Sequence, residues 1–414
     1  MATTLNPSEQ KSWFGQPPGL TILFLTEMWE KFSFFGMRAI LVYYMTKSLG
    51  FDQSKASYVY GIYAAFVYFT PVIGGWLADR WLGARRSVLI GSAVMAVGHA
   101  LMALPELFYP ALACIAIGSG LFLPNLPSQV LGLYREGDPR RGSAYNIYYA
   151  GINLGAILSP LICGTLGELA GWHWGFTAAA IGMCVGLGIY AGGGRWLVPV
   201  SQAKAEDRPS EAGSFARLFG VWFAVVLFRG AYEQIGNTIA LWADADVDRE
   251  IFGVVVPGSW VQAVNPILIF LLTPVVVGFW TRQAKAGREP SSPGKMARGA
   301  LGVAAAFLLL ALVNLASGKA NILWLMLFLA IFTSSELFIL PVGLGFFARL
   351  APEGRKSLTM AAWFFASFAG NLLAGALGSL WSAMSHFTFF AAMAGVAATA
   401  SLILYHLQAK GVSP

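Results

Sequence analysis

The chain has 414 residues, of which 57% are hydrophobic and only 11% are charged. Soluble domains carry roughly 25% charged residues, so this composition excludes a soluble globular protein and indicates a polytopic membrane protein. The net charge of +7 requires no nucleic-acid partner, because the bias of basic residues between loops, described below, accounts for it.

Stretches of about 20 apolar residues, the length that spans a bilayer as a helix, recur along the whole chain. We predict twelve membrane-spanning helices in two bundles of six. The first bundle comprises helices near residues 20–46, 57–78, 87–104, 108–134, 142–165 and 174–194. The second comprises helices near residues 215–242, 258–281, 297–317, 321–348, 357–382 and 387–408.

The first predicted helix carries an unusual concentration of charge: Glu27, Glu30, Lys31 and Arg38 lie within it. A charge at mid-bilayer costs at least ~2.5–3.5 kcal/mol, so these side chains must face protein or a water-filled cavity. Glu27, Lys31 and Arg38 share one helical stripe with Phe34, and Glu30 lies beside it. The sequence therefore predicts a polar pathway through the membrane domain.

Most of the 27 Lys and Arg residues lie in the tails, with Lys11 and Lys410, and in the even-numbered connections. The opposite connections hold Lys47, Lys55, Arg249 and Lys319. Because positive residues favour the cytoplasmic side, we expect both termini in the cytoplasm.

One long polar run, rich in Pro, Ser, Glu and Lys, separates the two sets of helices and has the composition of a flexible linker. We therefore predict five regions: a cytoplasmic tail at 1–19, a six-helix bundle at 20–196, a cytoplasmic linker at 197–214, a second six-helix bundle at 215–408, and a C-terminal tail at 409–414.

The remaining sequence features favour a membrane protein without enzymatic chemistry. Cys114, Cys163 and Cys184 lie in predicted helices at unrelated spacings and are interpreted as small apolar residues. The chain has no nucleotide-binding loop, nucleophile elbow or metal cluster, so we predict no metal, no cofactor and no enzyme activity. The start is polar and the first apolar run is too long and too charged for a cleavable signal peptide.

Two six-helix bundles with both termini inside are the plan of the major facilitator superfamily, whose halves rock about a site at the midplane. The connection after the second helix resembles the superfamily's G-x-L-a-D-r-x-G-r-R loop, whose Asp caps a helix end and helps to hold one side shut. The alternative is a solvated loop that only sets topology. The matching residues are Gly75, Asp79, Arg80, Gly83, Arg85 and Arg86.

The first helix, TEMWEKFSFFGMRAILVYYM, resembles the signature E-x-x-E-R-F-x-Y-Y-G-M-R-A-I-L of the proton-dependent oligopeptide transporters. Seven further helices carry motifs similar to this family's. They include Phe66–Tyr68, Gly120–Asn125 with Asp138–Arg141, Asn146–Ala156, Tyr232–Gln234, Gln262–Pro266, Glu336–Leu344 and Trp363–Asn371. The 18-residue join has no room for the two extra helices of many bacterial members.

This resemblance implies proton-coupled import of di- and tripeptides by alternating access, with protons as the coupling ion and no other cofactor. It implies a plasma (bacterial inner) membrane protein that works as a monomer in the lipid bilayer. Glu27, Glu30 and Glu233 correspond to the proton-coupling carboxylates, and Arg38 pairs with Glu233 in the outer gate. Glu336 matches the residue that meets a peptide's amino terminus.

The other pocket positions implied by the resemblance lie on several helices. They are Lys31, Phe34, Phe35, Arg38, Tyr68, Asn153, Arg229, Asn265, Trp363 and Ser367. The alternative for the carboxylates is that they form structural ion pairs. The alternative for the neutral residues is that they pack helices or satisfy backbone groups at helix breaks.

Three departures from the family pattern stand out. The Lys expected before Pro-Asn in the fourth helix is Leu123, the Trp expected four residues before Glu233 is Arg229, and the Tyr-Tyr pair is Phe34-Phe35. We hypothesise that the lost basic charge has moved to the seventh helix, where Arg229 either clamps Glu233 or receives a substrate carboxylate. The alternative is that Arg229 snorkels or pairs locally.

These departures keep other functions open. An exporter, or a permease for another amphipathic metabolite or a modified peptide with altered proton coupling, is the first alternative. A non-transporting receptor built on a transporter fold is a second, which would need an appended soluble domain or a long tail.

Overall fold

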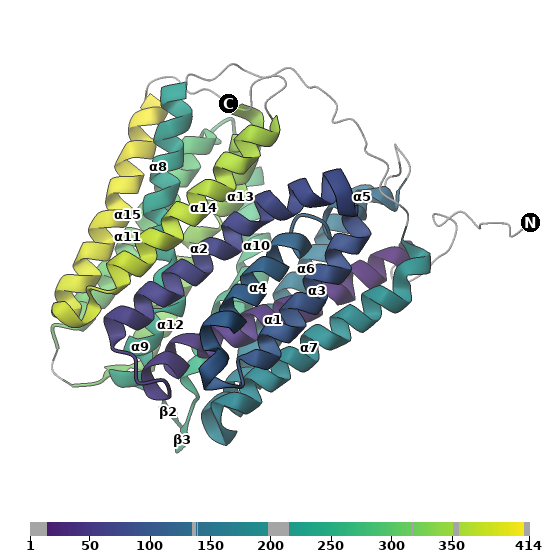
Figure 1. Ribbon diagram of the computed structural model, residues 1–414. Coiled ribbons are helices and arrows are strands. Elements are labelled where there is room, and N and C mark those ends of the chain that lie inside the picture. Colours follow the sequence, from purple (N-terminus) through teal and green to yellow (C-terminus); the bar gives the residue numbers. More distant parts are fainter. Residues whose placement is uncertain are drawn as a thin grey trace, which may run out of the picture. The chain divides into compact units, whose positions relative to one another are not determined.

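The computed structural model describes residues 15–134, 138, 140–197, 215–316, 318–350 and 356–409 (Figure 1). All structural statements below concern these residues. The two predicted tails lie mostly outside them, with Lys11 and Lys410, and so does all but Leu197 of the predicted linker.

Ten helices in the described ranges are long and apolar enough to cross a membrane. Helix α1 (Pro18–Lys47) is not among them because it carries Glu27, Glu30, Lys31 and Arg38. The predicted class, an all-α multi-pass membrane protein, is confirmed. The count of twelve helices and the position of the termini stay predictions.

The chain divides into two compact units, and the first comprises residues 1–41 and 66–205. Unit 1 contains most of α1 and the second half of α2 (Gln53–Leu77). Its other elements are η3 (Ala78–Leu82), α3 (Ala84–Leu101), η4 (Pro105–Leu107), α4 (Phe108–Phe122), α5 (Ser128–Gly132), α6 (Arg141–Ser159), η5 (Pro160–Gly164), η6 (Leu166–Ala170), α7 (Trp172–Gly192) and η7 (Gly193–Trp196).

Unit 2 comprises residues 42–65 and 206–414, so it includes the end of α1 and the first half of α2. Its other helices are α8 (Phe215–Tyr232), η8 (Glu233–Gly236), α9 (Thr238–Ala245), η9 (Gly258–Trp260), α10 (Val261–Lys285), α11 (Ser292–Val313), α12 (Ile322–Glu336), α13 (Leu340–Leu350), α14 (Lys356–Gly378), η10 (Trp381–Ala383) and α15 (His386–Ala409).

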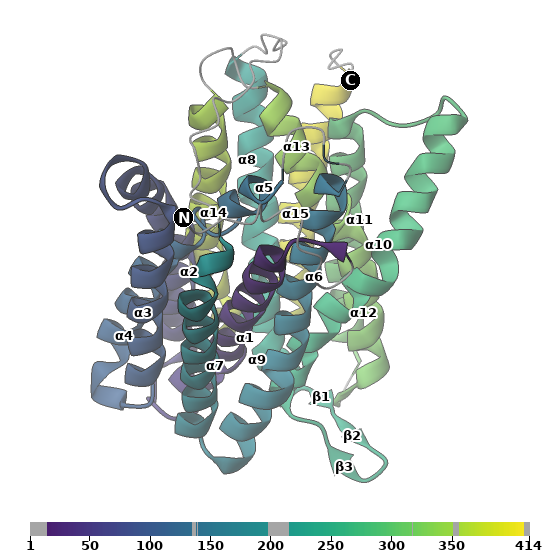
Figure 2. The ribbon, with the colours of Figure 1, turned by 90° about the vertical axis from the view of Figure 1, so that its right-hand side faces the viewer.

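Four two-residue strands lie in the connections of unit 2. β1 (Val247–Asp248) pairs in parallel with β4 (Ala320–Asn321). β2 (Glu250–Ile251) and β3 (Val254–Val255) form an antiparallel hairpin, which Figure 2 shows protruding beyond α9.

Close helix contacts build each unit. Between membrane helices association depends on packing more than on hydrophobic transfer, so small residues at crossings matter. In unit 1, a Cβ on Gly91 of α3 would lie 2.6 Å from the carbonyl oxygen of Gly118 on α4. In unit 2, α11 packs against α12 and α15, and the ring of Phe307 lies 5.4 Å from Phe328 and 6.3 Å from Phe390.

Three of the predicted spans contain a local interruption of the helix, although Leu218–Ala245 and Ile322–Phe347 each remain one apolar span. The segment 108–134 breaks between α4 and α5, where Pro124 and Pro127 lie, and 321–348 breaks just before Pro341. Proline lacks an amide hydrogen and disfavours the helical conformation of the preceding residue. The segment 215–242 breaks at Asn237, whose φ of −120° and ψ of −97° are not helical.

Candidate functional site

A buried charge cluster lies in α1. Glu27, Glu30 and Lys31 are 3%, 1% and 9% exposed. The ammonium of Lys31 lies 3.2 Å from Oε1 of Glu27 and 2.6 Å from Oε2 of Glu30. The hydroxyl of Tyr148 on α6 donates a 2.6 Å hydrogen bond to Oε2 of Glu27. Two carboxylates thus share one ammonium, and a phenol completes the cluster.

Glycines on the neighbouring helices let α1 carry this charge without exposing it to lipid. A Cβ on Gly155 of α6 would lie 2.3 Å from the carbonyl oxygen of Met28 and 3.0 Å from Cβ of Lys31. A Cβ on Gly182 of α7 would lie 2.5 Å from the ring of Phe32. Close approach excludes lipid and water, and an ionised group in such surroundings is stable only when paired.

The other predicted pocket residues of unit 1 are less enclosed. Phe34, Phe35, Arg38 and Tyr68 are partly exposed, and the rings of Phe34 and Phe35 make an edge contact at 5.2 Å. Asn153 is buried, and its amide donates a 3.0 Å hydrogen bond to the carbonyl of Tyr149 in its own helix. The alternative that Asn153 serves the backbone of its own helix therefore has a structural basis.

A second buried charge cluster lies in unit 2, around the break in the α8–α9 segment. Nη1 of Arg229 lies 3.1 Å from Oε1 of Glu233, one helical turn away. The guanidinium also lies over the ring of Tyr232, 5.6 Å from its centre. Arg229 and Glu233 are 7% and 1% exposed. The local pairing that we considered for Arg229 is therefore present.

Glu336, 6% exposed at the end of α12, is held through both oxygens. The hydroxyl of Tyr232 donates to Oε1 at 2.9 Å, and the amide of Asn265 on α10 donates to Oε2 at 2.9 Å. The same Asn265 amide donates to the hydroxyl of Thr333 at 2.9 Å. Tyr232 thus links the carboxylate of Glu336 to the guanidinium of Arg229 within one unit.

Trp363 and Ser367 on α14 lie in more apolar surroundings. Trp363 is 6% exposed and its ring makes an edge contact at 5.2 Å with Phe347 of α13. The hydroxyl of Ser367 donates a 3.4 Å hydrogen bond to the carbonyl of Trp363. Both arrangements are consistent with the helix-packing alternative.

The POT family model matches residues 85–201 and 197–393. The chain belongs to the POT family. A di-/tripeptide transporter of Lactococcus lactis is 31% identical over 94% of each chain. The peptide transporter YePEPT of Yersinia enterocolitica is 32% identical over 91% of this chain and 90% of its own. The crystal structure of a mutant peptide transporter POT with alafosfalin superposes with a TM-score of 0.90, at 30% identity, over 98% of this chain and 96% of that one.

POT family membership confirms the resemblance on which the sequence interpretation depends, and the structural match confirms a fold of the major facilitator type. It also confirms that the chain is a transporter and not an enzyme, because the family consists of peptide transporters. The three cysteines are free thiols, and the described ranges contain no cluster of ligands that could hold a metal ion.

The loop that resembles the superfamily's gate motif follows α2 in this POT member. The chain turns through η3 to Gly83, whose φ of 73° favours glycine. Asp79, Arg80, Arg85 and Arg86 are exposed. Among the described residues Asp79 makes no ion pair.

Two glycines near this loop make close contacts with neighbouring groups. The guanidinium of Arg85 lies against Gly194 of η7, where a Cβ would come within 1.8 Å of Nη2. Of the adjacent glycines Gly74 and Gly75, Gly74 makes the closer helix contact. A Cβ added at Gly74 would lie 2.1 Å from the carbonyl oxygen of Gly120, whereas one added at Gly75 would lie at an ordinary 3.7 Å from Pro124.

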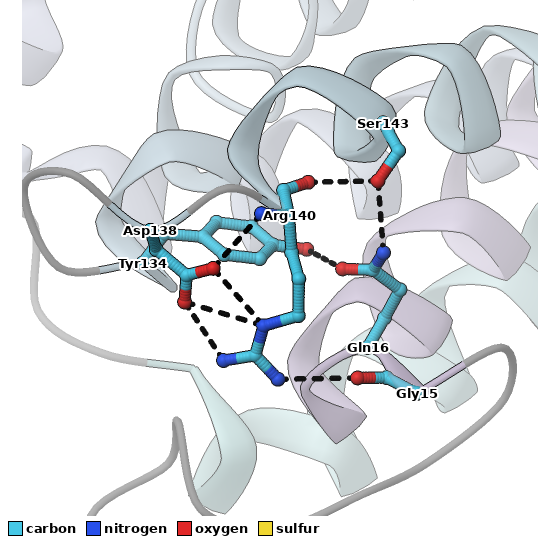
Figure 3. Close-up of polar contacts among 6 residues, drawn as sticks. All are labelled: Gly15, Gln16, Tyr134, Asp138, Arg140 and Ser143. Atoms are coloured by element: carbon cyan, nitrogen blue, oxygen red, sulfur yellow. Dashed lines mark hydrogen bonds and ion pairs between the residues drawn. The ribbon is translucent and has the colours of Figure 1, made fainter.

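Figure 3 shows a polar network that ties the start of α1 to the connection before α6. Arg140 donates to the carboxylate of Asp138, at 2.7 Å from Nη2, and to the carbonyl of Gly15 at 3.1 Å. Tyr134 donates to Gln16 at 2.8 Å, and Gln16 donates to the hydroxyl of Ser143 at 3.0 Å.

The pKa values of two groups in this network are shifted in opposite directions, one by charge and the other by burial. The hydrogen bonds from Arg140 hold the pKa of the Asp138 carboxyl below its usual value. Burial raises the pKa of Tyr134 to about 12, so its hydroxyl stays a donor at neutral pH. Pro139 of this motif lies outside the described residues.

The structure adds functional candidates that the motifs did not single out. Tyr148 and Tyr232 each donate to a carboxylate, and Thr333 contacts Asn265. Their sequence signals were weak: Tyr148 lies inside the NIYYAGINLGA run and Tyr232 directly precedes Glu233. Arg38 and Glu233 belong to different units, so their pairing stays a prediction.

Proposed function

We propose that this POT member imports di- and tripeptides or peptide-like compounds together with protons, by alternating access. The observation that carries this proposal is the pair of buried charge clusters in otherwise apolar membrane helices. Intramembrane ionisable groups are expensive and usually functional. The related transporter of Lactococcus lactis is named for di- and tripeptides, and a POT mutant was crystallised with alafosfalin.

Proton coupling is assigned to Glu27, Glu30 and Glu233. In the α1 cluster two carboxylates face one ammonium. When both carboxylates are ionised, the cluster therefore has a net charge of −1. A single proton balances it, and this makes the cluster suited to switch with proton binding. Protonation of Glu233 would release Arg38 and let the outer gate open.

Substrate binding is assigned to residues on several helices. Glu336 would receive the amino terminus of the peptide, because Tyr232 and Asn265 fix both of its oxygens. Arg38 and Lys31 supply positive charge for the carboxylate. The neutral contacts are proposed for Phe34, Phe35, Tyr68, Asn153, Asn265, Trp363 and Ser367.

A variant of this function is favoured by one observation. Leu123 packs against the apolar core of unit 1, whereas Arg229 is paired with Glu233 in unit 2. In this variant, Arg229 on the seventh helix supplies the basic charge expected in the fourth. This redistribution favours a modified peptide or another amphipathic metabolite, carried with altered proton coupling.

For the setting of this transport, we propose a multi-pass protein of the bacterial inner membrane that works as a monomer, with both termini in the cytoplasm. The bundles would span 20–196 and 215–408. The loop with Gly75, Asp79, Arg80, Gly83, Arg85 and Arg86 would then lie on the cytoplasmic side and help to hold that side shut.

Uptake by proteoliposomes tests the proposal. Purified protein is reconstituted with an alkaline interior, and labelled dialanine is supplied in an acidic exterior. Uptake above that of protein-free liposomes, abolished by a protonophore, is the expected result. If the rate of peptide uptake is the same with and without the proton gradient, transport is facilitated and not coupled to protons. Accumulation only with an acidic interior would indicate an exporter.

A further inference from the structure

The second half of α10 lies almost uncovered on unit 2. From Phe270 to the end of the helix at Lys285 no residue is buried, whereas α11 and α12 each bury a regular face. Figure 2 shows the end of α10 standing apart from the other helices of unit 2. This half of α10 belongs to an apolar span long enough to cross a membrane. Lipid chains are therefore the medium that covers it.

A line of exposed side chains on α10 leads to basic residues at the end of the helix. Leu271, Val275, Phe279 and Arg282 follow one another at spacings of four, four and three residues, which places them on one helical face. All four are exposed. Lys285, also exposed, follows Arg282 by three residues and lies on the same side of the helix. The apolar stripe of α10 therefore ends in two cations.

A second line of this kind lies on α11, which runs back from the connection. Arg298 is followed on the same helical face by Leu301, Ala305, Leu308 and Leu312. All five side chains are exposed, although the opposite face of α11 is buried in the core of unit 2. Each of two consecutive helices thus presents an apolar stripe with an arginine at its connected end.

The two basic ends are joined by a short connection, since α10 ends at Lys285 and α11 begins at Ser292. The helices meet there through Lys295, whose ammonium lies 4.8 Å from the centre of the Trp280 ring. Farther from the connection, α10 packs on α12, and α11 packs on α12 and α15, rather than on each other. The two stripes are therefore tied together at their basic ends.

The positive charge at this end of the two helices is not neutralised by the protein. Four exposed basic side chains gather here: Arg282, Lys285, Arg288 and Arg298. Within the described ranges none of the four forms an ion pair, and Glu289, the acid of the connection, pairs with Lys295. Topology requires positive charge on this side of the membrane, but not its alignment with two apolar stripes. The combination of apolar stripes and unpaired cations matches a ligand with apolar chains and an anionic head.

We propose that this corner of unit 2, formed by the second half of α10, the connection and the first half of α11, binds an anionic phospholipid. Arg282 and Lys285 hold its phosphate from α10, and Arg298 holds it from α11. The acyl chains run along the two stripes. A guanidinium can bind a phosphate through two parallel hydrogen bonds. Each basic residue near an anionic lipid surface strengthens the association about fivefold.

Fluorescence quenching in lipid nanodiscs tests this site without peptide or proton gradient, so the result does not depend on the proposed transport. Cys114, Cys163 and Cys184 are replaced, and a bimane label is attached to Val275→Cys on α10 or to Ile181→Cys on α7. The native side chains at these two positions are 65% and 58% exposed. Phosphatidylcholine nanodiscs are doped with increasing amounts of brominated phosphatidylglycerol or brominated phosphatidylcholine.

The label on α10 should be half-quenched at about a 30-fold smaller fraction of brominated phosphatidylglycerol than of brominated phosphatidylcholine, as expected for two basic residues on one phosphate. The label on α7, a helix without Lys or Arg, should respond equally to both lipids. Equal half-quenching fractions at the α10 label overturn the site, because they show that lipid covers α10 without regard to charge.

Charge-removing variants locate the headgroup. Arg282→Gln should lower the lipid preference at the α10 label about fivefold, and adding Arg298→Gln should lower it about fivefold again. Lys55→Gln combined with Lys319→Gln removes two exposed charges elsewhere and should leave the preference unchanged. A preference that survives in the Arg282 and Arg298 double variant overturns the site. An equal fall in the Lys55 and Lys319 double variant also overturns it, because net charge alone would then explain the effect.

Discussion

Replacing Gly155 by Ala should separate α1 from α6 and dismantle the buried charge cluster. The new methyl group would meet the carbonyl oxygen of Met28 at 2.3 Å and the amide nitrogen of Phe32 at 2.9 Å. Both are backbone atoms and cannot rotate away. The helices must therefore move apart, and the 2.6 Å hydrogen bond from Tyr148 to Glu27 spans this same contact.

The expected cost has two parts. Overpacking a close contact costs about 1–3 kcal/mol. Loss of a buried hydrogen bond to a charged group adds about 1.5–3 kcal/mol. The variant should therefore lose roughly 2.5–6 kcal/mol of stability, visible as a marked drop in the melting temperature of the purified protein, and its peptide uptake should fall.

Gly188→Ala is the matched control for this prediction. It lies in the neighbouring helix α7, where a Cβ meets nothing within 4 Å. An unstrained Gly→Ala change stabilises by about 0.4–1 kcal/mol through the unfolded state. If Gly155→Ala melts at the temperature of the wild type or of Gly188→Ala, the close contact between α1 and α6 does not hold the cluster.

Three further changes test the other contacts. Tyr232→Phe keeps the ring but removes the hydroxyl that donates to Glu336, so stability should fall by about 1.5–3 kcal/mol and the KM for dialanine should rise. An unchanged KM would mean that this hydroxyl takes no part in substrate binding. Arg229→Ala removes one ion-pair partner of the buried Glu233 carboxylate and should cost about 3–5 kcal/mol and abolish uptake, whereas full uptake would remove the relocated-charge hypothesis. Asp138→Asn should lower the melting temperature at pH 7. Because Arg140 depresses the pKa of Asp138, the difference from wild type should persist down to pH ~3.8 and vanish below it, and a difference that fades near neutral pH would contradict this pairing.

The sequence alone was sufficient for the membrane class, the family and the burial of Glu27, Glu30 and Lys31. These follow from composition, from the cost of a charge in lipid, and from motifs that lie within single helices. Lys31 does meet Glu27, which lies one helical turn away on the same face, and it also reaches Glu30, which lies beside that face.

Other features depend on contacts that no local pattern encodes. Tyr148 reaches Glu27 across 121 positions in the chain, and Tyr232 reaches Glu336 across 104. The break at Asn237 was missed because it lies inside a run long enough to span the membrane, and its broken backbone is supported from another helix. Gln234 supplies that support by donating to the carbonyl of Ala374 on α14.

The division of α1 between the two units gives this helix a dual attachment, and this has a mechanical consequence for the proposed function. Its charged turn is held in unit 1 by Tyr148, and its last turns are held in unit 2 through Tyr43 and Lys47. Roughly 20 Å of helix separates Lys31 from Tyr43, at 1.5 Å per residue. A continuous helix of this length transmits a shift at one end to the other. A change of charge at Glu27 or Glu30 that loosens α1 in unit 1 therefore also acts on the end of the helix, where Tyr43 and Lys47 make their contacts.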